Sequence, residues 1–517
     1  MAGSGRCMLT AEAESGRRLI IRADADSRMG TGHVMRCLAL AGAWQERGGR
    51  VLLAGHIGSD SIRERLNRQR VELFALTSGP QAAEDMQWLD MLRHEPAGRA
   101  GEGWIVLDGY QFDNAYQQRL RRSGLKLLVI DDYAHLPAYE ADLLLNQNPG
   151  SEKLNYQTSP ATVLLRGGKY VLLRREFSEA RRMGTAAAAE QATRLLITLG
   201  GADPDNVTLK VMAALRQLDL PVQAKIIVGP ANPHLPLLRE WMGRASLPAE
   251  LLIDVADMAP LMQWADAAVT AGGSTCWELA CLGVPALVIT LADNQRGVAR
   301  IIAESGAGLD CGWHHTLQPD QLARSIAALG RDQRQRQAMG VAGRALVDGD
   351  GADRVAERML CFPFAFREAG PDDCLQVFEW ANDPVIRNAS FHRGAIDRQE
   401  HEAWFARTLA DPVTLFWIIM LHGDRPAGQV RFAISNGEAV ISISLAAAYR
   451  NAGLGSRAIS TACCRLFARG GISVVHARIR KDNAQSIKSF TRAGFVLHSE
   501  ETVQGFPALR MSLRDTR

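Results

Sequence analysis

Short apolar runs that alternate with helix-compatible stretches constrain this chain more than any other feature. The first run, Leu19–Asp24, is followed by a glycine turn over Met29–His33 and by apolar residues at helical spacing over Val34–Arg47. This alternation predicts βα units on a parallel sheet. Further runs of the same kind lie at 51–54, 104–107, 126–130 and 143–145.

A second series of the same kind begins near Arg194, where the run Leu195–Leu199 leads into Gly200 and Gly201. The two series join around Arg174–Gln191 and predict two doubly wound α/β lobes. Ligands of such sheets bind beyond the carboxyl ends of the strands, where the glycine turns of this sequence fall. The later runs of the second series lie at 224–228, 251–253, 267–269 and 286–290.

The pattern changes between Gly340 and Pro363, where a mixed α+β module begins. Its apolar runs at 415–420, 426–434 and 440–445 follow one another closely, which indicates antiparallel hairpins rather than crossovers. We therefore expect five parts: a loose tail over 1–18, a first Rossmann-like lobe over 19–180, a second over 190–350, a linker over 351–361 and the mixed domain over 362–517.

Composition narrows the function classes. The net charge of +3 over 517 residues gives no basic stripe of the kind that nucleic-acid binding needs. No apolar run of about 18 residues predicts a membrane span, and Met1–Arg18 does not have the pattern of a signal peptide. The nine cysteines show no zinc spacing, so we expect free thiols and a cytoplasmic location. Asp131 and Asp132 end a strand, but spacing supplies no third ligand, so no metal is expected.

The first candidate site is the turn that contains Gly30, Gly32 and His33, between a strand and a helix. Glycines let the backbone approach a ligand, and the amino end of the helix offers N–H groups to a phosphate. A histidine at this rim can exchange a proton near neutral pH. Taken alone, the same residues also fit a tight turn with a solvated histidine.

The second candidate site follows an apolar strand in the second lobe. Gly273 and Ser274 are expected to cap a helix and face a diphosphate, and Glu278, one turn later, can accept hydrogen bonds from ribose hydroxyls. The amides of Asn294 and Gln295 suit a uracil or a sugar, because they both donate and accept. Glu278 alone is also explained as a carboxylate stabilised by the helix dipole.

Several motifs between residues 19 and 350 resemble the UDP-sugar hydrolases of pseudaminic acid biosynthesis. They are Arg22-Ala23-Asp24 with 30–40, 107–110, 170–177, 199–204 and the second-lobe motif from Ala271 through Gln295. The resemblance implies a GT-B-like fold of the MurG type and hydrolysis of UDP-2,4-diacetamido-2,4,6-trideoxy-β-L-altropyranose with inversion at the anomeric carbon. It also implies that His33 is the general base that activates water.

The same resemblance assigns binding roles. Ser274 and Glu278 would hold the UDP moiety, Asn294 and Gln295 the nucleotide or sugar, and Asp108 and Tyr110 would reach the sugar from the first lobe.

The third candidate site follows the expected strand that ends at Leu445. A loop from Arg450 to Ser456 carries glycines that clear space for backbone N–H groups to meet a pyrophosphate, and a helix over 457–468 follows. A glycine-rich turn without a ligand would have the same pattern.

Residues 362–515 resemble the GNAT N-acetyltransferases, through this loop, through 483–490 with Ala493-Gly494-Phe495, and through the opening residues 364–367 and 380–384. The resemblance implies direct transfer from acetyl-CoA to an amine and a splayed strand edge that accepts the pantetheine arm. The acetyl-CoA-binding residues expected from it are Leu445, Arg450, Asn451, Ala452, Gly453, Leu454, Gly455, Ser456, Asn483, Ser486 and Phe490.

One departure concerns proton transfer. Many relatives have a tyrosine where this chain has Phe490, and phenylalanine cannot protonate a departing thiolate. Tyr449 precedes the loop, and Ser442 and Ser444 either hold a water that deprotonates the amine or simply face solvent. The general acid and base of acetyl transfer therefore stay open.

Together the resemblances predict a bifunctional enzyme of pseudaminic acid biosynthesis. Residues 362–515 would N-acetylate UDP-4-amino-4,6-dideoxy-N-acetyl-β-L-altrosamine, and residues 19–350 would then hydrolyse the product to UDP and free sugar. The expected partners are small-molecule UDP-sugars, with no nucleic acid and no membrane; the sequence leaves the oligomeric state open. The alternatives are a glycosyltransferase or another nucleotide-sugar hydrolase fused to an unrelated N-acetyltransferase, or a UDP-sugar sensor that regulates the acetyltransferase.

Overall fold

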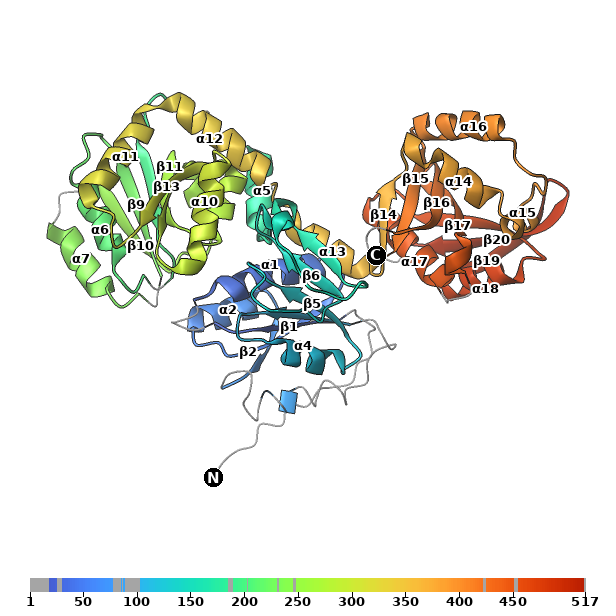
Figure 1. The fold of residues 1–517 in the computed structure, drawn as a ribbon, viewed down its shortest axis with the longest axis horizontal. Helices are drawn as coiled ribbons and strands as arrows, with labels where there is room; N and C mark the ends of the chain where they lie inside the picture. Colours follow the sequence, from blue (N-terminus) through green and yellow to red (C-terminus); the bar gives the residue numbers. More distant parts are fainter. Residues whose placement is uncertain are drawn as a thin grey trace. The chain divides into compact units, whose positions relative to one another are not determined.

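The computed structural model describes residues 18–25, 30–77, 85, 87–88, 103–184, 189–201, 203–229, 232–244, 248–421, 425–450 and 454–515. The chain divides into two compact units, residues 1–356 and 357–517. Helix α13 (Gly351–Cys361) crosses this division, so the stretch expected as a linker is helical (Figure 1). The expected tail lies outside the described residues except for Arg18, which begins the first strand.

The first sheet of the first unit has seven strands in the order β3-β2-β1-β4-β5-β6-β7. Every pairing in it is parallel. The order reverses between β1 and β4, which makes their carboxyl ends a topological switch point. The strands are β1 (Arg18–Ala23), β2 (Arg50–Gly55), β3 (Glu72–Ala75), β4 (Trp104–Asp108), β5 (Lys126–Ile130), β6 (Leu143–Asn146) and β7 (Val163–Arg166).

The helices of this sheet are α1 (Gly32–Gln45), α2 (Asp60–Arg68) and α4 (Asn114–Arg121). Helix α1 packs against β1, β2 and β4, and its buried side chains include Val34, Leu38 and Trp44. The continuous apolar runs of β4 and β5 are buried on both faces, as a parallel sheet covered by helices requires.

The second sheet has six strands in the order β10-β9-β8-β11-β12-β13, again parallel throughout. Its switch point lies between β8 and β11, so the two sheets share the same kind of topology. The strands are β8 (Arg194–Thr198), β9 (Gln223–Val228), β10 (Ala249–Ile253), β11 (Ala267–Ala271), β12 (Ala286–Thr290) and β13 (Gly308–Trp313).

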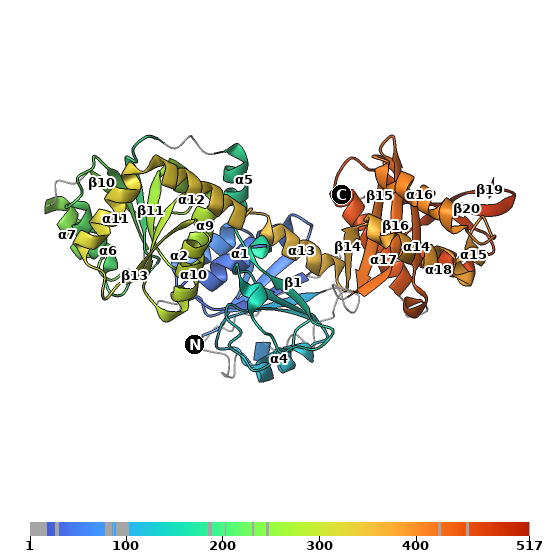
Figure 2. The same ribbon diagram turned by 45° about the horizontal axis from the view of Figure 1, so that its top comes forward.

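Helices cover this sheet and link it to the first. Helices α9 and α12 pack against each other (Figure 2). Gly343 allows their close approach, because a Cβ there would lie 3.0 Å from the carbonyl oxygen of Ala280. Phe177 and Ala180 of α5 join the hydrophobic core beneath the second sheet. The helices are α5 (Arg175–Met183), α6 (Val207–Leu215), α7 (Leu235–Arg244), α8 (Ala259–Trp264), α9 (Thr275–Leu282), α10 (Arg296–Glu304), α11 (Pro319–Arg331) and α12 (Gln333–Leu346).

The second unit contains a mixed sheet of seven strands in the order β14-β15-β16-β17-β18-β20-β19. All its neighbours are antiparallel except β17 and β18. The strands are β14 (Phe364–Glu368), β15 (Thr414–Leu421), β16 (Arg425–Ser435), β17 (Glu438–Leu445), β18 (Val474–Arg480), β19 (Val496–Val503) and β20 (Phe506–Arg514).

Helices cover both faces of this sheet. One face buries Val430 and Phe432 in a core with α17 and α18, and the other buries Phe416 and Ile418 with α14 and α16 (Figure 1). The helices are α14 (Cys374–Ala381), α15 (Pro384–Ala389), α16 (Arg398–Ala410), α17 (Leu454–Ala468) and α18 (Ala484–Arg492).

The predicted fold class is confirmed: two parallel α/β sheets precede a mixed α+β domain. Seven strands were not predicted: β3, β7 and β13 of the parallel sheets, and β14, β18, β19 and β20 of the mixed sheet. Strands β3 and β13 have partly exposed, interrupted apolar patterns, and β7 alternates in burial over only a few residues. Within the described ranges, no helix combines the length and the apolar character needed to cross a membrane.

Candidate functional site

His33 and Asp108 meet at the switch point of the first sheet. His33 lies in the first turn of α1, the helix that follows β1 along the chain, and Asp108 is the last residue of β4. Nδ1 of His33 lies 2.7 Å from Oδ1 of Asp108. The turn that leads to His33 depends on Gly30, whose φ of +77° lies in the left-handed region.

Arg36 fixes the carboxylate of Asp108 from the next turn of α1. Its Nε donates to Oδ2 at 2.7 Å and its Nη2 to Oδ1 at 2.7 Å, a bidentate pair. Cys37 adds a thiol contact to Oδ2 at 3.4 Å. Although burial alone would raise it, the Arg36 guanidinium and His33 hold the pKa of Asp108 well below its usual range.

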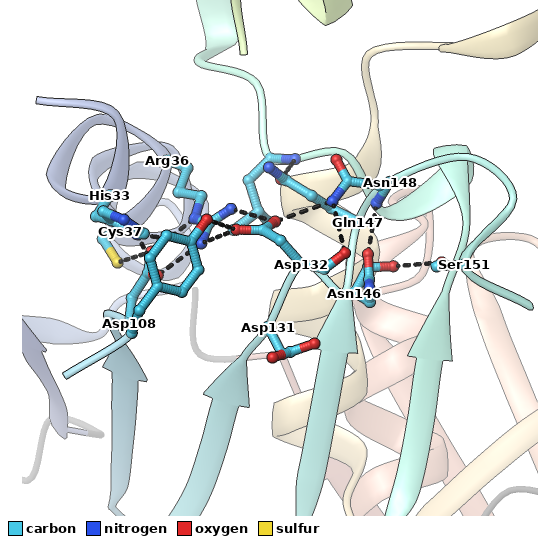
Figure 3. Close-up of polar contacts among 12 residues, drawn as sticks. His33, Arg36, Cys37, Asp108, Asp131, Asp132, Asn146, Gln147, Asn148 and Ser151 are labelled. Atoms are coloured by element: carbon cyan, nitrogen blue, oxygen red, sulfur yellow. Dashed lines mark hydrogen bonds and ion pairs between the residues drawn. The ribbon is translucent and has the colours of Figure 1, made fainter. Parts of the chain in front are cut away.

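The same guanidinium extends the network to Asp132, just beyond β5. Nη1 of Arg36 donates to Oδ1 of Asp132 at 2.8 Å, and the hydroxyl of Tyr110 donates to Oδ2 at 2.7 Å. Asn148 donates to Oδ1 at 2.9 Å (Figure 3). Burial opposes ionisation of Asp132, but Arg36 and Tyr110 keep its pKa lowered. The network thus joins the carboxyl ends of three neighbouring strands.

Asp131, its neighbour, points to a separate cluster. The hydroxyls of Tyr139 and Tyr156 donate to its two oxygens at 2.8 and 2.7 Å, and Nδ1 of His135 lies 2.6 Å away. These hydrogen bonds outweigh burial and lower the pKa of Asp131 to about 2. Asp131 and Asp132 are therefore both held by protein groups, rather than forming a simple polar strand end.

This geometry fixes the chemistry that His33 can perform. An ionised carboxylate only accepts hydrogen bonds, so Nδ1 of His33 carries the proton toward Asp108. When the ring carries only this proton, Nε2 presents a lone pair, the state of a general base. The side chain of His33 is 12% exposed, whereas that of Asp108 is fully buried.

The geometry changes the expected role of Asp108. Because both its oxygens are occupied by His33, Arg36 and Cys37, Asp108 orients His33 rather than reaching toward a sugar. Tyr110 packs edge-on against His33 with ring centroids 4.9 Å apart, so it lies beside this histidine. Sequence reasoning missed Arg36 and Asp132. A charged residue one turn after His33 on an apolar helix was the available signal.

In the second lobe the motif follows β11. Ser274 occupies the N-cap position of α9, but its side chain makes no capping hydrogen bond, because its backbone already has helical angles. The expected cap is therefore absent and the serine is exposed. A Cβ on Gly272 would lie 2.8 Å from the carbonyl oxygen of Gln295, so this glycine, next to the predicted Gly273, allows close approach of the two loops.

The two predicted amides behave differently. Oε1 of Gln295 accepts from the backbone N–H of Leu291 at 3.0 Å, which holds its own loop. Asn294 is exposed in the short helical turn Asp293–Gln295.

Glu278 faces Arg174 from the first turn of α9. Nη2 of Arg174 lies 3.7 Å from Oε1 of Glu278. Burial raises the pKa of Glu278 to about 7, with Arg174 opposing the rise. The carboxylate that we expected to bind ribose thus titrates close to neutral pH.

In the second unit, β17 and β18 diverge. They pair only from Glu438 opposite Val474 to Val440 opposite His476, although β17 runs on to Leu445. Because β16 still pairs with β17 as far as Leu445, only the edge toward β18 is open. This is the splayed edge that the resemblance implies.

Arg450 closes the far end of β17. Its Nε donates to the carbonyl oxygen of Leu445 at 2.8 Å, and its Nη1 donates to Asp383 at 2.8 Å. The guanidinium therefore braces the strand end. Asn451, Ala452 and Gly453 lie outside the described residues; Leu454, Gly455 and Ser456 form the first turn of α17.

The remaining expected acetyl-CoA residues lie on α18. Asn483 caps this helix by accepting from the backbone N–H of Ser486 at 3.1 Å. Phe490 is buried in the core and packs edge-on against Phe495, with ring centroids 4.9 Å apart. Tyr449 packs against the same core.

Across the described parts of the chain, no three histidine, cysteine or acidic side chains gather as metal ligands would. The cysteines in these parts are free thiols.

The fold and the sites define a class: two Rossmann-like lobes of the GT-B kind, followed by a domain of the acetyltransferase kind. Family models agree with both halves. The glycosyltransferase family 28 C-terminal domain matches residues 195–354, and the acetyltransferase (GNAT) domain matches residues 364–496. The chain therefore joins a nucleotide-sugar type of module to a GNAT acetyltransferase domain.

Three relatives place it further. The spore coat polysaccharide biosynthesis protein SpsG of Bacillus subtilis is 31% identical over 232 residues, which cover 44% of this chain and 68% of SpsG. The chain belongs to the family of SpsG. An uncharacterized protein of Methanocaldococcus jannaschii is 21% identical over 92% of this chain and 96% of its own length, so its similarity runs through both units. The UDP-2,4-diacetamido-2,4,6-trideoxy-β-L-altropyranose hydrolase of Campylobacter jejuni is 23% identical over 56% of this chain and 97% of its own length.

Proposed function

We propose that the chain is a bifunctional enzyme that N-acetylates a UDP-linked 4-amino sugar and then hydrolyses the product to UDP and free sugar. The observation that carries the hydrolase half is the His33–Asp108 pair, which leaves Nε2 of His33 as a base at a strand switch point. The similarity to the Campylobacter hydrolase supports UDP-2,4-diacetamido-2,4,6-trideoxy-β-L-altropyranose as the sugar nucleotide.

In the hydrolytic step, Nε2 of His33 takes a proton from water while the water oxygen attacks the anomeric carbon. The bond from that carbon to the UDP oxygen breaks, and UDP leaves as an anion, with inversion at the anomeric carbon. Asp108 stabilises the imidazolium that forms, because its carboxylate is already ionised and hydrogen-bonded to Nδ1. Arg36 and Asp132 keep that carboxylate in place.

In the second lobe, Ser274, Glu278 and the loop of Asn294 and Gln295 would hold the UDP moiety. An exposed serine at the start of α9 suits a diphosphate, since the first N–H groups of a helix have no partners within the helix. Glu278 accepts from the ribose hydroxyls when ionised.

In the acetyl-transfer step, acetyl-CoA is the cosubstrate. Its pantetheine arm would pair with the open edge of β17, and the first turn of α17 would meet the pyrophosphate. The amine attacks the thioester carbonyl, the carbon–sulfur bond breaks, and CoA leaves as a thiolate. Phe490 has no hydroxyl to protonate the thiolate, and we propose that solvent water takes the proton that the amine loses.

The test is the coupled reaction, followed by NMR with UDP-4-amino-4,6-dideoxy-N-acetyl-β-L-altrosamine and acetyl-CoA. We expect CoA first, then UDP and free sugar. His33→Asn should lower UDP release by about 10²–10⁴ and leave acetylation intact. His56→Asn, a half-buried histidine of the same lobe, is the matched control. Unchanged UDP release in His33→Asn would reject His33 as the base.

A second function is favoured by the family 28 glycosyltransferase match. In that case the sugar is transferred to an acceptor instead of water. Product analysis separates the two, because a glycosylated acceptor in place of free sugar identifies a transferase. UDP binding without any turnover would instead indicate a sensor.

A further inference from the structure

Strands β16 and β17 present polar side chains on one face of the acetyltransferase sheet. In their antiparallel ladder Gln429 lies opposite Ser444, and Arg431 lies opposite Ser442. Since alternate residues of a strand share a face, these side chains form two adjacent polar pairs. The residues between them, such as Val430, face the core with α17 on the other side of the sheet.

Several polar atoms of this face are buried without a hydrogen-bond partner among the described residues. They are Oε1 of Gln429, Oγ of Ser444 and Nε of Arg431. Gln429 is only 8% exposed. Buried polar groups are normally hydrogen-bonded in proteins. The unpartnered atoms of this cluster lie beside an open strand edge and are therefore available to a ligand.

The guanidinium of Arg431 indicates that such a ligand is negatively charged. Its guanidinium stacks over Trp404 at 4.6 Å and over Phe416 at 5.6 Å, and its Nη2 donates to Ser442 at 3.3 Å. Within the part of the chain that the structure describes, no carboxylate forms an ion pair with it, and burial lowers the pKa of Arg431 to about 10. A partly buried arginine without an acid suits a phosphate or carboxylate.

Gln429 and Ser444 suit the other end of the ligand. Oε1 of Gln429 can only accept a hydrogen bond, and Oγ of Ser444 can accept one, so both fit the N–H groups of an amine. Ser444 lies in the stretch where β17 has left β18, which is where the thioester would lie. Gly428 sits beside it, and a Cβ there would come within 2.2 Å of the carbonyl oxygen of Ser444.

The spacing of the two ends matches a sugar. Gln429 and Arg431 are two residues apart on one strand, about 7 Å. A pyranose ring separates a C4 amine from a phosphate on C1 by a similar span. The amine would then lie at Gln429 and Ser444 while the phosphate contacts Arg431.

We propose that Arg431 selects the phosphorylated form of the acetyl acceptor by contacting its phosphate, while Gln429 and Ser444 receive its amine. This inference rests on the proposed function and deepens it. A free amino sugar offers Arg431 no anion and brings a second cation to the site, so it should be a poor acceptor.

The test compares initial rates of CoA release from the full chain with the UDP-linked 4-amino sugar and with the same amino sugar lacking UDP. Wild type should prefer the UDP-linked amine by at least about tenfold in kcat/KM, the size of one charge-assisted hydrogen bond. Arg431→Met should lose about 10- to 100-fold on the UDP-linked amine, mostly in KM, and little on the free amine. Arg431→Lys should recover part of the preference, and Arg407→Met, an exposed arginine of α16, should change nothing.

Equal use of both amines by wild type would overturn the inference. So would an equal fall on both amines in Arg431→Met, which would show that Arg431 only supports the fold. If neither form of the altrosamine is acetylated, the proposed function fails. The inference is then tested on 4-amino-4-deoxyglucose and 4-amino-4-deoxygalactose with their 1-phosphates: an Arg431-dependent preference for the phosphorylated amine supports it, and no such preference, or no acetylation of any of them, refutes it.

Discussion

The two candidate sites differ in how their polar side chains are satisfied. In the first unit, both oxygens of Asp108 have partners, and Arg36 bridges this carboxylate to Asp132. In the second unit, polar atoms of Gln429, Arg431 and Ser444 are buried without partners among the residues that the structure describes. The first arrangement is complete without a ligand, as the proposed proton transfer requires. The second would be completed by the ligand that we propose for it.

The largest effect should come from breaking the completed network. Asp108→Asn removes the charge that orients His33 and leaves Arg36 with Asp132 alone. We expect UDP release to fall about 10²–10⁴-fold and the first unit to lose about 3–5 kcal/mol of stability. Asp142→Asn, a carboxylate of the same lobe paired with Arg121, is the control for kinetics and thermal unfolding. Acetylation should persist; full UDP release would show that the Asp108 charge is dispensable.

Acidification probes the neighbouring cluster, in which His135, Tyr139 and Tyr156 hold Asp131. Its folded pKa of about 2 lies below the usual value, so the stability it contributes is present above about pH 4 and is lost as the pH falls toward 2. The contribution is about 2 kcal/mol. Thermal unfolding between pH 5 and pH 3 should therefore show a steeper loss in wild type than in Asp131→Asn. Parallel curves would mean that folding does not lower the pKa of Asp131.

Glu278 allows a test in the second lobe, where its carboxylate lies 3.7 Å from Arg174. Because burial raises its pKa to about 7, it is mostly protonated at pH 6 and mostly ionised at pH 8. Only the ionised form accepts from both ribose hydroxyls, so the affinity for a UDP-sugar should rise up to about tenfold across this range. The diphosphate diester does not titrate there. Calorimetry with Glu278→Gln should give a flat profile; a slope that persists would assign it to another group.

The smallest effect distinguishes two helix caps. Asn483 accepts from the backbone of Ser486, whereas Ser274 makes no capping hydrogen bond. Asn483→Ala should cost the second unit about 1 kcal/mol, and Ser274→Ala should leave the stability of the first unit nearly unchanged. Ser274→Ala should instead weaken UDP binding. Equal losses of stability would show that Ser274 caps its helix in solution.

Much of the fold could be predicted from the sequence, because many strands are marked by residues that follow one another in the chain. Strands β5 and β12 were predicted to the residue, because both are continuous apolar runs between clear breaks. Strand β13 was missed, since its glycines and exposed positions resemble a loop. Its place in the sheet depends on pairing with β12, which is a long-range contact.

Part of the site in the first lobe could also be predicted, because some of its residues lie close together in the chain. Gly30 and His33 share one turn, so their motif is visible in the sequence. The pairing of His33 with Asp108 depends on β1 and β4 becoming neighbours across 75 residues. Likewise the unpartnered face around Arg431 is formed by two strands and a helix, and no local pattern marks it.

The divergence of β17 and β18 has a further consequence. An unpaired strand edge invites pairing with other chains, and proteins usually cover such edges. Here the opening lies within the sheet, and the amide groups of a pantetheine arm can bond to it as a missing strand would. Bound acetyl-CoA would then take the place of a paired strand and stiffen the middle of the sheet. Its release would leave this part of β17 unpaired again.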